Sequence, residues 1–411
     1  MTPRRIHRIV LIALVALIAL PASYLVRLQL QVGRTLNQYE AEIKAVLEDV
    51  PVRSWSVQPV FGSPEPGNGW ELLAPALKEI HDCYPFVGSG TLRQKDPNLD
   101  SDVVQGDFPR LIPVLDSALQ HCRQALRRST WEWSGPPDPD LAEKVNRASR
   151  AFWAKAYFSR KTGRDAEALE WLIAACSVAQ MAAWTGQEGT WGSMQSVERW
   201  LYGDAQLTLS GHDLTAAALL DIEHRVDLLR ANRPPFRLRL RLCAAQTANR
   251  LLGNQIYELS DDPAVPPVPL LATAGWRDLY SRNVFAARIL NDLDARVRQL
   301  EAMSWSPSGT SSQRAEDIRS QCRLDTVRSL LPSWQEFTHE QETLLRLDLL
   351  RLALAFARAQ AQSGLFPKSA SDAGLPLELG LPLRVGEDRL SPEVSEPMVE
   401  LEWVIRRRTK D

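Results

Sequence analysis

The N-terminal segment combines a basic start with a long apolar run. Arg4, Arg5 and Arg8 precede residues 9–26, which carry no charge. A helix over this run would span about 27 Å at ~1.5 Å per residue, close to the ~30 Å hydrocarbon thickness of a bilayer. Because a basic flank holds the N-terminus in the cytoplasm, we expect a single pass through the cytoplasmic membrane, with the bulk of the chain on the periplasmic or extracellular side.

Two interpretations of this segment compete. A cleaved signal peptide needs small residues before the cut, and Leu20, Pro21 and Ala22 match that pattern only imperfectly. Arg27 follows the run directly, and a more polar helix is expected to continue after it. We therefore favour an uncleaved signal anchor, and cleavage stays the alternative. A buried N-terminal helix is a third interpretation, which the flanking arginines disfavour.

Apolar positions spaced three and four residues apart predict helices through most of the remaining chain. The expected helices cover residues 37–50, 70–83, 108–128, 193–209, 214–232, 276–303, 315–331 and 340–362. Residues 51–69 and 88–107 are rich in breakers and predict loops. Residues 236–242 alternate between apolar residues and arginine, as a strand does, but no breaker follows them, so we favour a helix with a strand as the alternative.

Residues 141–186 predict the best-formed helical hairpin. Val145, Ala148 and Phe152 line its first helix, residues 162–165 form the turn, and residues 166–184 form the second helix, with Gly186 near its end. The hairpin resembles one tetratricopeptide-type unit, although no second copy follows 34 residues later. In the following pair of helices, residues 210–213 match a capping box ahead of the second helix.

The last part of the chain predicts a small sheet from residues 383–385, 389–390 and 398–405. Elsewhere we expect no sheet. The predicted fold class is mainly α: irregular, loosely tetratricopeptide-like helical hairpins with one N-terminal transmembrane helix and a small C-terminal β element. The expected segments are an anchor (1–35), a helical stalk region with long loops (36–135), a helical-hairpin domain (136–335), and a long apolar helix with the sheet (336–411).

Composition narrows the function classes only a little. The chain is 45% hydrophobic and 24% charged with a net charge of −2, so it is neither a disordered chain nor an obvious binder of nucleic acid. The sequence has no Gly-x-Ser-x-Gly elbow, no phosphate loop and no paired-histidine zinc helix. We therefore expect no cofactor, leave catalytic residues unassigned, and regard an enzyme as the less favoured class.

The cysteines suggest one structural bond. Cys83 and Cys122 lie near the ends of two predicted helices and are the best disulfide candidates in an oxidising compartment, with free thiols as the alternative. Together with His81 and His121 they also suggest a zinc site. Adjacent residues on a helix point about 100° apart, however, so His121 and Cys122 are badly placed to bind one ion, and we expect no metal.

Aromatic residues provide the candidate binding surface. The chain has 13 tryptophans, most of which we expect in the core. The hairpins between residues 141 and 232 carry a surplus, and Trp153, Tyr157, Trp184 and Trp200 are the candidate lining of a partner groove.

The C-terminal part resembles a group of uncharacterised bacterial membrane-anchored helical proteins. The residues that carry this resemblance are an apolar small-residue helix, then Gly364-Leu365-Phe366-Pro367-Lys368-Ser369, then Pro382-Leu383-Arg384. The Gly-x-aromatic-Pro-x-Ser part is also similar to a motif of pseudopilin-like proteins. The resemblance implies a helical, anchored fold and no known active site.

These observations favour a membrane-anchored envelope protein that acts as a protein-interaction scaffold. Its expected partners are other envelope proteins and, through residues 9–26, the cytoplasmic membrane, with no nucleic acid. The alternative is an exported enzyme or ligand binder with a site in the helical-hairpin cavity. A component of a secretion or pilus-like machine is a weaker alternative, resting on the C-terminal motif alone.

Overall fold

A computed structural model shows that the chain is mainly helical with two small sheets. It describes residues 15–27, 30–31, 34, 54–83, 108–133, 138–187, 189–211, 214–240, 292–293, 295–300, 302–303, 310–322, 328, 331, 334–365, 367–369, 372–373, 383–385, 389–392 and 403–404. The chain divides into two compact units. One comprises Met1–Val50, Leu240–Met303 and Ala315–Ser333, and the other comprises Pro51–Arg239, Ser304–Arg314 and Trp334–Asp411. The change between the units at Ser333 and Trp334 lies within two residues of the expected boundary at 335.

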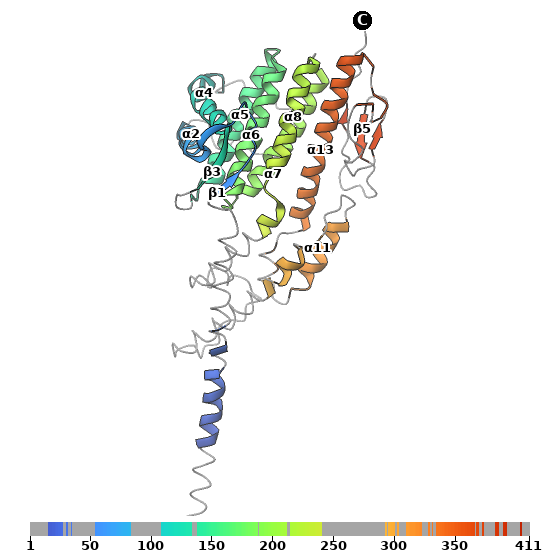
Figure 1. Ribbon diagram of the computed structural model, residues 1–411. Coiled ribbons are helices and arrows are strands. Elements are labelled where there is room, and N and C mark those ends of the chain that lie inside the picture. Colours follow the sequence, from blue (N-terminus) through green and yellow to red (C-terminus); the bar gives the residue numbers. More distant parts are fainter. Residues whose placement is uncertain are drawn as a thin grey trace, which may run out of the picture. The chain divides into compact units, whose positions relative to one another are not determined.

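The second unit, here called the helical unit, is built on the predicted hairpin. Helix α5 (Leu141–Lys161) and helix α6 (Asp165–Trp184) pack side by side (Figure 1). Gly163 adopts a φ of 72° in the turn between them, a conformation that residues with a side chain rarely adopt. Helix α6 is the central element, and nearly all its side chains from Ala168 to Ala183 are buried. The predicted hairpin is therefore confirmed.

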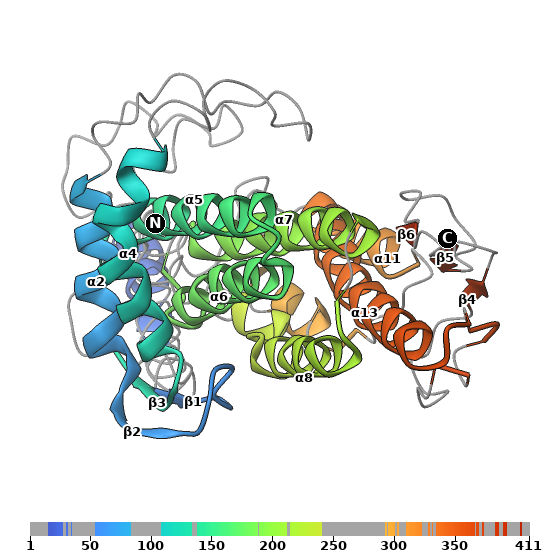
Figure 2. The same ribbon diagram turned by 90° about the horizontal axis from the view of Figure 1, so that it is seen from above.

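Three further helices extend this hairpin (Figure 2). Helix α7 (Thr190–Gly211) packs on α6 and α5, helix α8 (Ala216–Asn232) packs on α6, and helix α13 (Trp334–Ser363) packs on α7 and α8. The predicted capping box at 210–213 is wrong as the start of α8. The N-cap is Thr215, whose hydroxyl accepts a hydrogen bond from the backbone N–H of Ala218 at 3.2 Å. Residues 236–240 are helical, as favoured.

The N-terminal part of the helical unit contains a three-stranded sheet that was not expected from the sequence. Strand β3 (Arg128–Glu132) pairs antiparallel with β1 (Ser54–Ser56) and parallel with β2 (Glu65–Asn68). Residues 51–69 are thus not simply a loop, and the expectation that sheet is confined to the C-terminus is wrong. The pairing depends on a contact between distant segments: Trp55 lies opposite Trp131, and their buried rings stack at 6.3 Å.

Helices α2 (Gly69–Cys83) and α4 (Phe108–Ala125) pack against each other, and both contact α5. Their bounds agree with the predicted 70–83 and, apart from the last three residues, with 108–128. Gly69 opens α2 directly against the sheet. A Cβ atom there would lie 2.6 Å from the Trp131 ring, so only glycine permits this approach.

The C-terminal part of the helical unit agrees with the sequence pattern. Helix α13 ends at Ser363 and is followed by Gly364, which has a φ of 72°. Strands β4 (Leu383–Val385), β5 (Arg389–Pro392) and β6 (Trp403–Val404) then form an antiparallel sheet in the order β4-β5-β6. The predicted small C-terminal sheet is confirmed.

The first unit is described in part. Residues 15–27 and most of 292–300 are helical, and the unit also contains residues 315–320 of helix α11 (Thr310–Ser320), which ends before the predicted residue 331. Glu316 pairs with Arg319 and Arg328, and Arg296 donates a hydrogen bond to the Gln321 amide oxygen at 2.9 Å. Within the described residues, no helix has the length and apolarity needed to cross a bilayer. The start of the predicted span (9–14), the stalk helix 37–50, the loop 88–107 and much of 276–303 lie outside them.

Candidate functional site

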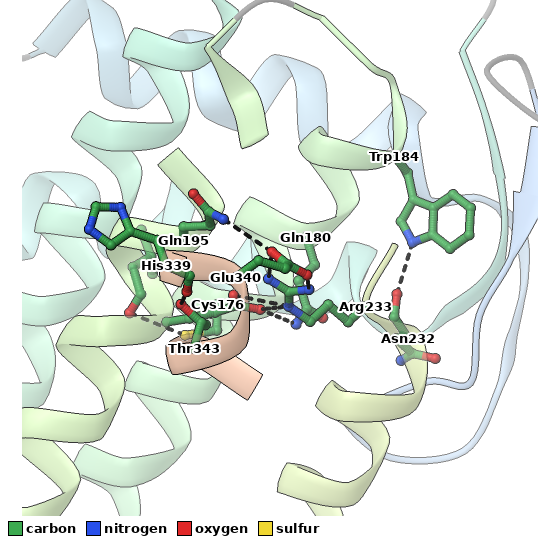
Figure 3. A network of polar contacts seen from close by, with 11 residues as sticks. Cys176, Gln180, Trp184, Gln195, Asn232, Arg233, His339, Glu340 and Thr343 are labelled. Carbon is green, nitrogen blue, oxygen red and sulfur yellow. Dashed lines mark hydrogen bonds and ion pairs between the residues drawn. The ribbon is translucent and has the colours of Figure 1, made fainter. Parts of the chain in front are cut away.

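The most concentrated polar chemistry in the helical unit is a buried charge cluster (Figure 3). Arg233 follows the last residue of α8, Glu198 lies on α7 and Glu340 lies on α13. The Arg233 guanidinium donates from Nε to Glu198 at 3.0 Å and from Nη2 to Glu340 at 2.8 Å, and its Nη1 contacts the same Glu340 carboxylate. These three side chains are 4%, 0% and 2% exposed, respectively, so the cluster is sealed from solvent.

Two glutamines complete the cluster and bring in α6. The Gln180 amide donates to Glu198 at 2.8 Å, and the Gln195 amide donates to Glu340 at 3.0 Å. Arg233 also lies over the Trp191 ring at 5.7 Å, a cation–π contact. The carboxylates are therefore satisfied from several sides, and the cluster connects α6, α7, α13 and the end of α8.

The electrostatics of the cluster follow from its composition. It contains one more carboxylate than guanidinium, in surroundings that water does not reach. Burial raises the pKa of Glu198, and this effect outweighs the opposing influence of Arg233 and the hydrogen bond from Gln180. Burial acts to lower the pKa of Arg233, but Glu198 and Glu340 raise it well above its usual range, so the guanidinium stays charged.

This arrangement is suited to fastening helices together and not to catalysis. Every charged oxygen is engaged by a protein donor, and the fully buried side chains leave a substrate no route to them. The cluster is not apparent from the sequence because its members come from separate helices. One feature of the sequence does indicate that Glu198 is buried. Its spacing places it on the same helix face as Met194, Leu201 and Ala205, which are all buried.

The four candidate groove residues do not lie together. Trp184 belongs to a different environment: its indole N–H donates to the Asn232 carbonyl at 2.8 Å, and its ring stacks on Trp55 at 6.3 Å (Figure 3). Asn232 in turn exchanges two hydrogen bonds with the backbone of Gln58. Trp184 therefore joins α6, α8 and the sheet, and we no longer place it in a groove.

Trp153 and Tyr157 do line a crevice between α5 and α7. Their rings stack at 5.8 Å, and the Trp153 indole N–H donates to the Asp204 carboxylate at 2.6 Å. Arg160 lies 3.7 Å from the same carboxylate, and Ala168 and Leu172 of α6 form part of the lining. Burial raises the pKa of Asp204, against the opposing influence of Trp153 and Arg160. The crevice has a free volume of about 10 Å³, room for about one water molecule.

Trp200 lies on the outer side of α7. It is 39% exposed, and Leu207, two turns further along, is 52% exposed. Between them, a Cβ atom on Gly203 would meet nothing within 4 Å, so the space in front of the helix is open. Trp200 and Leu207 therefore form an exposed apolar surface beside the crevice.

The cysteine prediction is not confirmed. Cys83 and Cys122 are both free thiols. Cys122 is fully buried between the packed α2 and α4, and burial, reinforced by Glu79, raises its pKa far above the ordinary range, so this thiol behaves as a small apolar core residue. Cys176 is likewise buried, and its thiol lies 3.5 Å from the Val197 carbonyl.

Within the described part of the chain, histidine, cysteine and carboxylate side chains form no group of three or more that could hold a metal ion. His81 and Cys83, considered above for zinc, end α2 without such a group around them. Comparison of the chain with protein-family models, with curated proteins and with solved structures gives no match in any of the three.

Proposed function

We propose that this chain is a membrane-anchored envelope protein whose helical unit binds other proteins. The binding surface in this proposal is the α5–α7 face, defined as Arg150, Trp153, Tyr157 and Lys161 of α5 with Trp200, Gly203 and Leu207 of α7. The observation that carries the proposal is the exposure of Trp200 and Leu207 beside the Trp153–Tyr157 crevice. Trp200 and Leu207 lie on the same side of α7, and exposed apolar side chains that gather on one side of a helix are typical of protein-interaction sites.

The order of helix packing supports a scaffold. Helix α5 contacts α6 and α7, helix α6 contacts α7 and α8, and helix α13 contacts both α7 and α8. Stacked helical hairpins of tetratricopeptide type pack in this way and use the side of the stack to bind partner segments. We therefore propose a tetratricopeptide-like arrangement, built from hairpins of unequal length, as the basis of the partner surface.

The buried charge cluster does not favour the enzyme alternative. Its carboxylates are engaged internally, and the crevice at Trp153 is far smaller than the roughly 300–1,000 Å³ of a small-molecule site. A partner protein needs no enclosed pocket, because it can lie across the α5–α7 face and bury Trp200 from outside.

Affinity capture from the native membranes tests the proposal. We compare wild type with a Trp200→Ala/Leu207→Ala double variant and with Leu220→Ala, a matched control that truncates a 54% exposed leucine on α8. We expect a partner that is retained by wild type and by the control but is lost from the double variant, with thermal unfolding unchanged in all three. Equal capture by all variants would place binding elsewhere, and turnover of an envelope substrate without any partner would favour the enzyme.

A further inference from the structure

Helices α5 and α7 run side by side in the same direction, so their outward side chains form one surface. Near the start of both helices, Ser193 Oγ lies 3.5 Å from the Ala142 carbonyl, and further along both, Trp153 pairs with Asp204. Both pairs join residues 51 positions apart in the sequence. The same offset places Arg150 of α5 close to the level of Trp200 of α7, and Tyr157 close to the level of Leu207. The aromatic, apolar and charged groups of the α5–α7 face can therefore contact the same bound segment.

The charges on this surface are mostly positive. Lys161 Nζ and the Arg160 guanidinium lie 5.3 Å and 5.7 Å from the centre of the Tyr157 ring. The carboxylate beside them, Asp204, is already engaged by Trp153 and Arg160. Within the described residues, Arg150 forms no ion pair although it is only partly buried. The positive charge here is a local feature, because the chain as a whole has a net charge of −2.

The apolar groups fix where a partner side chain would sit. Trp200 and Leu207 flank Gly203, in front of which the structure leaves open space. An apolar side chain of a bound segment placed over Gly203 would be covered on both sides, and a flanking carboxylate of that segment would then reach Arg150.

We infer that the α5–α7 face binds an acidic segment of another protein, with an apolar side chain of that segment over Gly203 and a carboxylate toward Arg150. This inference rests on the proposed function and adds the chemistry of the partner. Carboxylates favour the face through charge complementarity, whereas a basic segment would meet repulsion from the same side chains.

Binding of defined peptide pools to the full-length chain in detergent tests the inference. Each pool contains fluorescent 12-residue peptides with a central leucine or phenylalanine, flanked by acidic, neutral or basic residues. We expect the acidic pool to bind at least tenfold more tightly than the neutral pool and the basic pool not to bind. Arg150→Glu should weaken acidic binding about tenfold, Trp200→Ala should weaken all binding, and Leu220→Ala should leave binding unchanged, with equal thermal unfolding throughout.

The outcomes separate the inference from the proposed function. If the neutral or basic pool binds as tightly as the acidic pool and depends on Trp200, the face is a binding site but the acidic preference is wrong. The inference is also overturned if acidic binding is insensitive to Arg150→Glu. If no pool binds in a way that Trp200→Ala weakens, the inference fails and the proposed function loses its supporting surface as well.

Discussion

At the residue scale, Arg233 is important because it neutralises the carboxylates of Glu198 and Glu340, which are buried away from water. Its guanidinium is the one cationic group that contacts both Glu198 and Glu340 in the described cluster, and both carboxylates are at most 2% exposed. A buried ion pair adds little stability over an apolar replacement, but removing one partner leaves the other charge uncompensated. The cluster therefore contributes mainly through the large cost of disrupting it.

The first prediction compares two substitutions in this cluster. Arg233→Met removes the only positive charge and should lower the free energy of unfolding by about 3–5 kcal/mol. Glu198→Gln removes the excess negative charge while keeping an oxygen for Arg233, so its cost should stay within about 1–2 kcal/mol. Urea unfolding of both variants measures the difference. Similar losses for the two would show that charge balance does not control stability here.

The second prediction concerns pH. Burial raises the folded-state pKa of Glu198, whereas the unfolded side chain titrates at about 4.3. The contribution of this group to stability is therefore fully present below about pH 4.3 and is lost as the pH rises through the folded-state pKa. Wild type should lose stability relative to Glu198→Gln over this range. Parallel stability curves for the two proteins from pH 4 upward would contradict the raised pKa.

At the element scale, local patterns predicted much of the fold. The turn at residues 162–165 and the spacing of apolar residues on either side of it define α5 and α6. Both patterns are local, because they involve residues close together in the sequence. The sheet was missed because its strands are short and its pairing is non-local: Trp55 lies opposite Trp131, and neither segment alternates clearly. Side-chain composition singled out Trp153 and Tyr157, whose rings stack on each other, but only packing shows that Trp184 faces the sheet.

The third prediction concerns the start of α8. Thr215 accepts a hydrogen bond from the Ala218 N–H, so Thr215→Ala should cost about 1 kcal/mol. Asp140, at the N-cap of α5, makes no side-chain capping bond, and Asp140→Ala is therefore a matched control with a smaller expected cost. Thermal unfolding compares the two. A larger loss for Asp140→Ala would show that capping at Thr215 does not hold α8.

At the scale of the whole molecule, the proposal combines two features of different origin. The apolar run 9–26 is a sequence feature that predicts a membrane anchor, and the α5–α7 face is a feature of the helical unit. If both hold, the protein presents an exposed aromatic surface to partners in the envelope while the membrane limits its diffusion.

The fourth prediction tests the anchor. The protein should sediment with membranes, resist extraction by alkaline carbonate, and retain its first 27 residues, because the cleavage pattern at Leu20-Pro21-Ala22 is weak. Intact-mass measurement of the purified protein decides the matter. A mature N-terminus at Ser23 or Tyr24 would show that the segment is a cleaved signal peptide.

Site-specific photocrosslinking in living cells tests the central claim most directly. A photoreactive amino acid replaces either Trp200 on the α5–α7 face or Leu220 on α8, two exposed positions in the same helical unit. We predict a discrete crosslinked adduct with another protein from position 200 and none from position 220. Adducts of equal yield from both positions, or from position 220 alone, would contradict the assignment of the α5–α7 face as the partner surface.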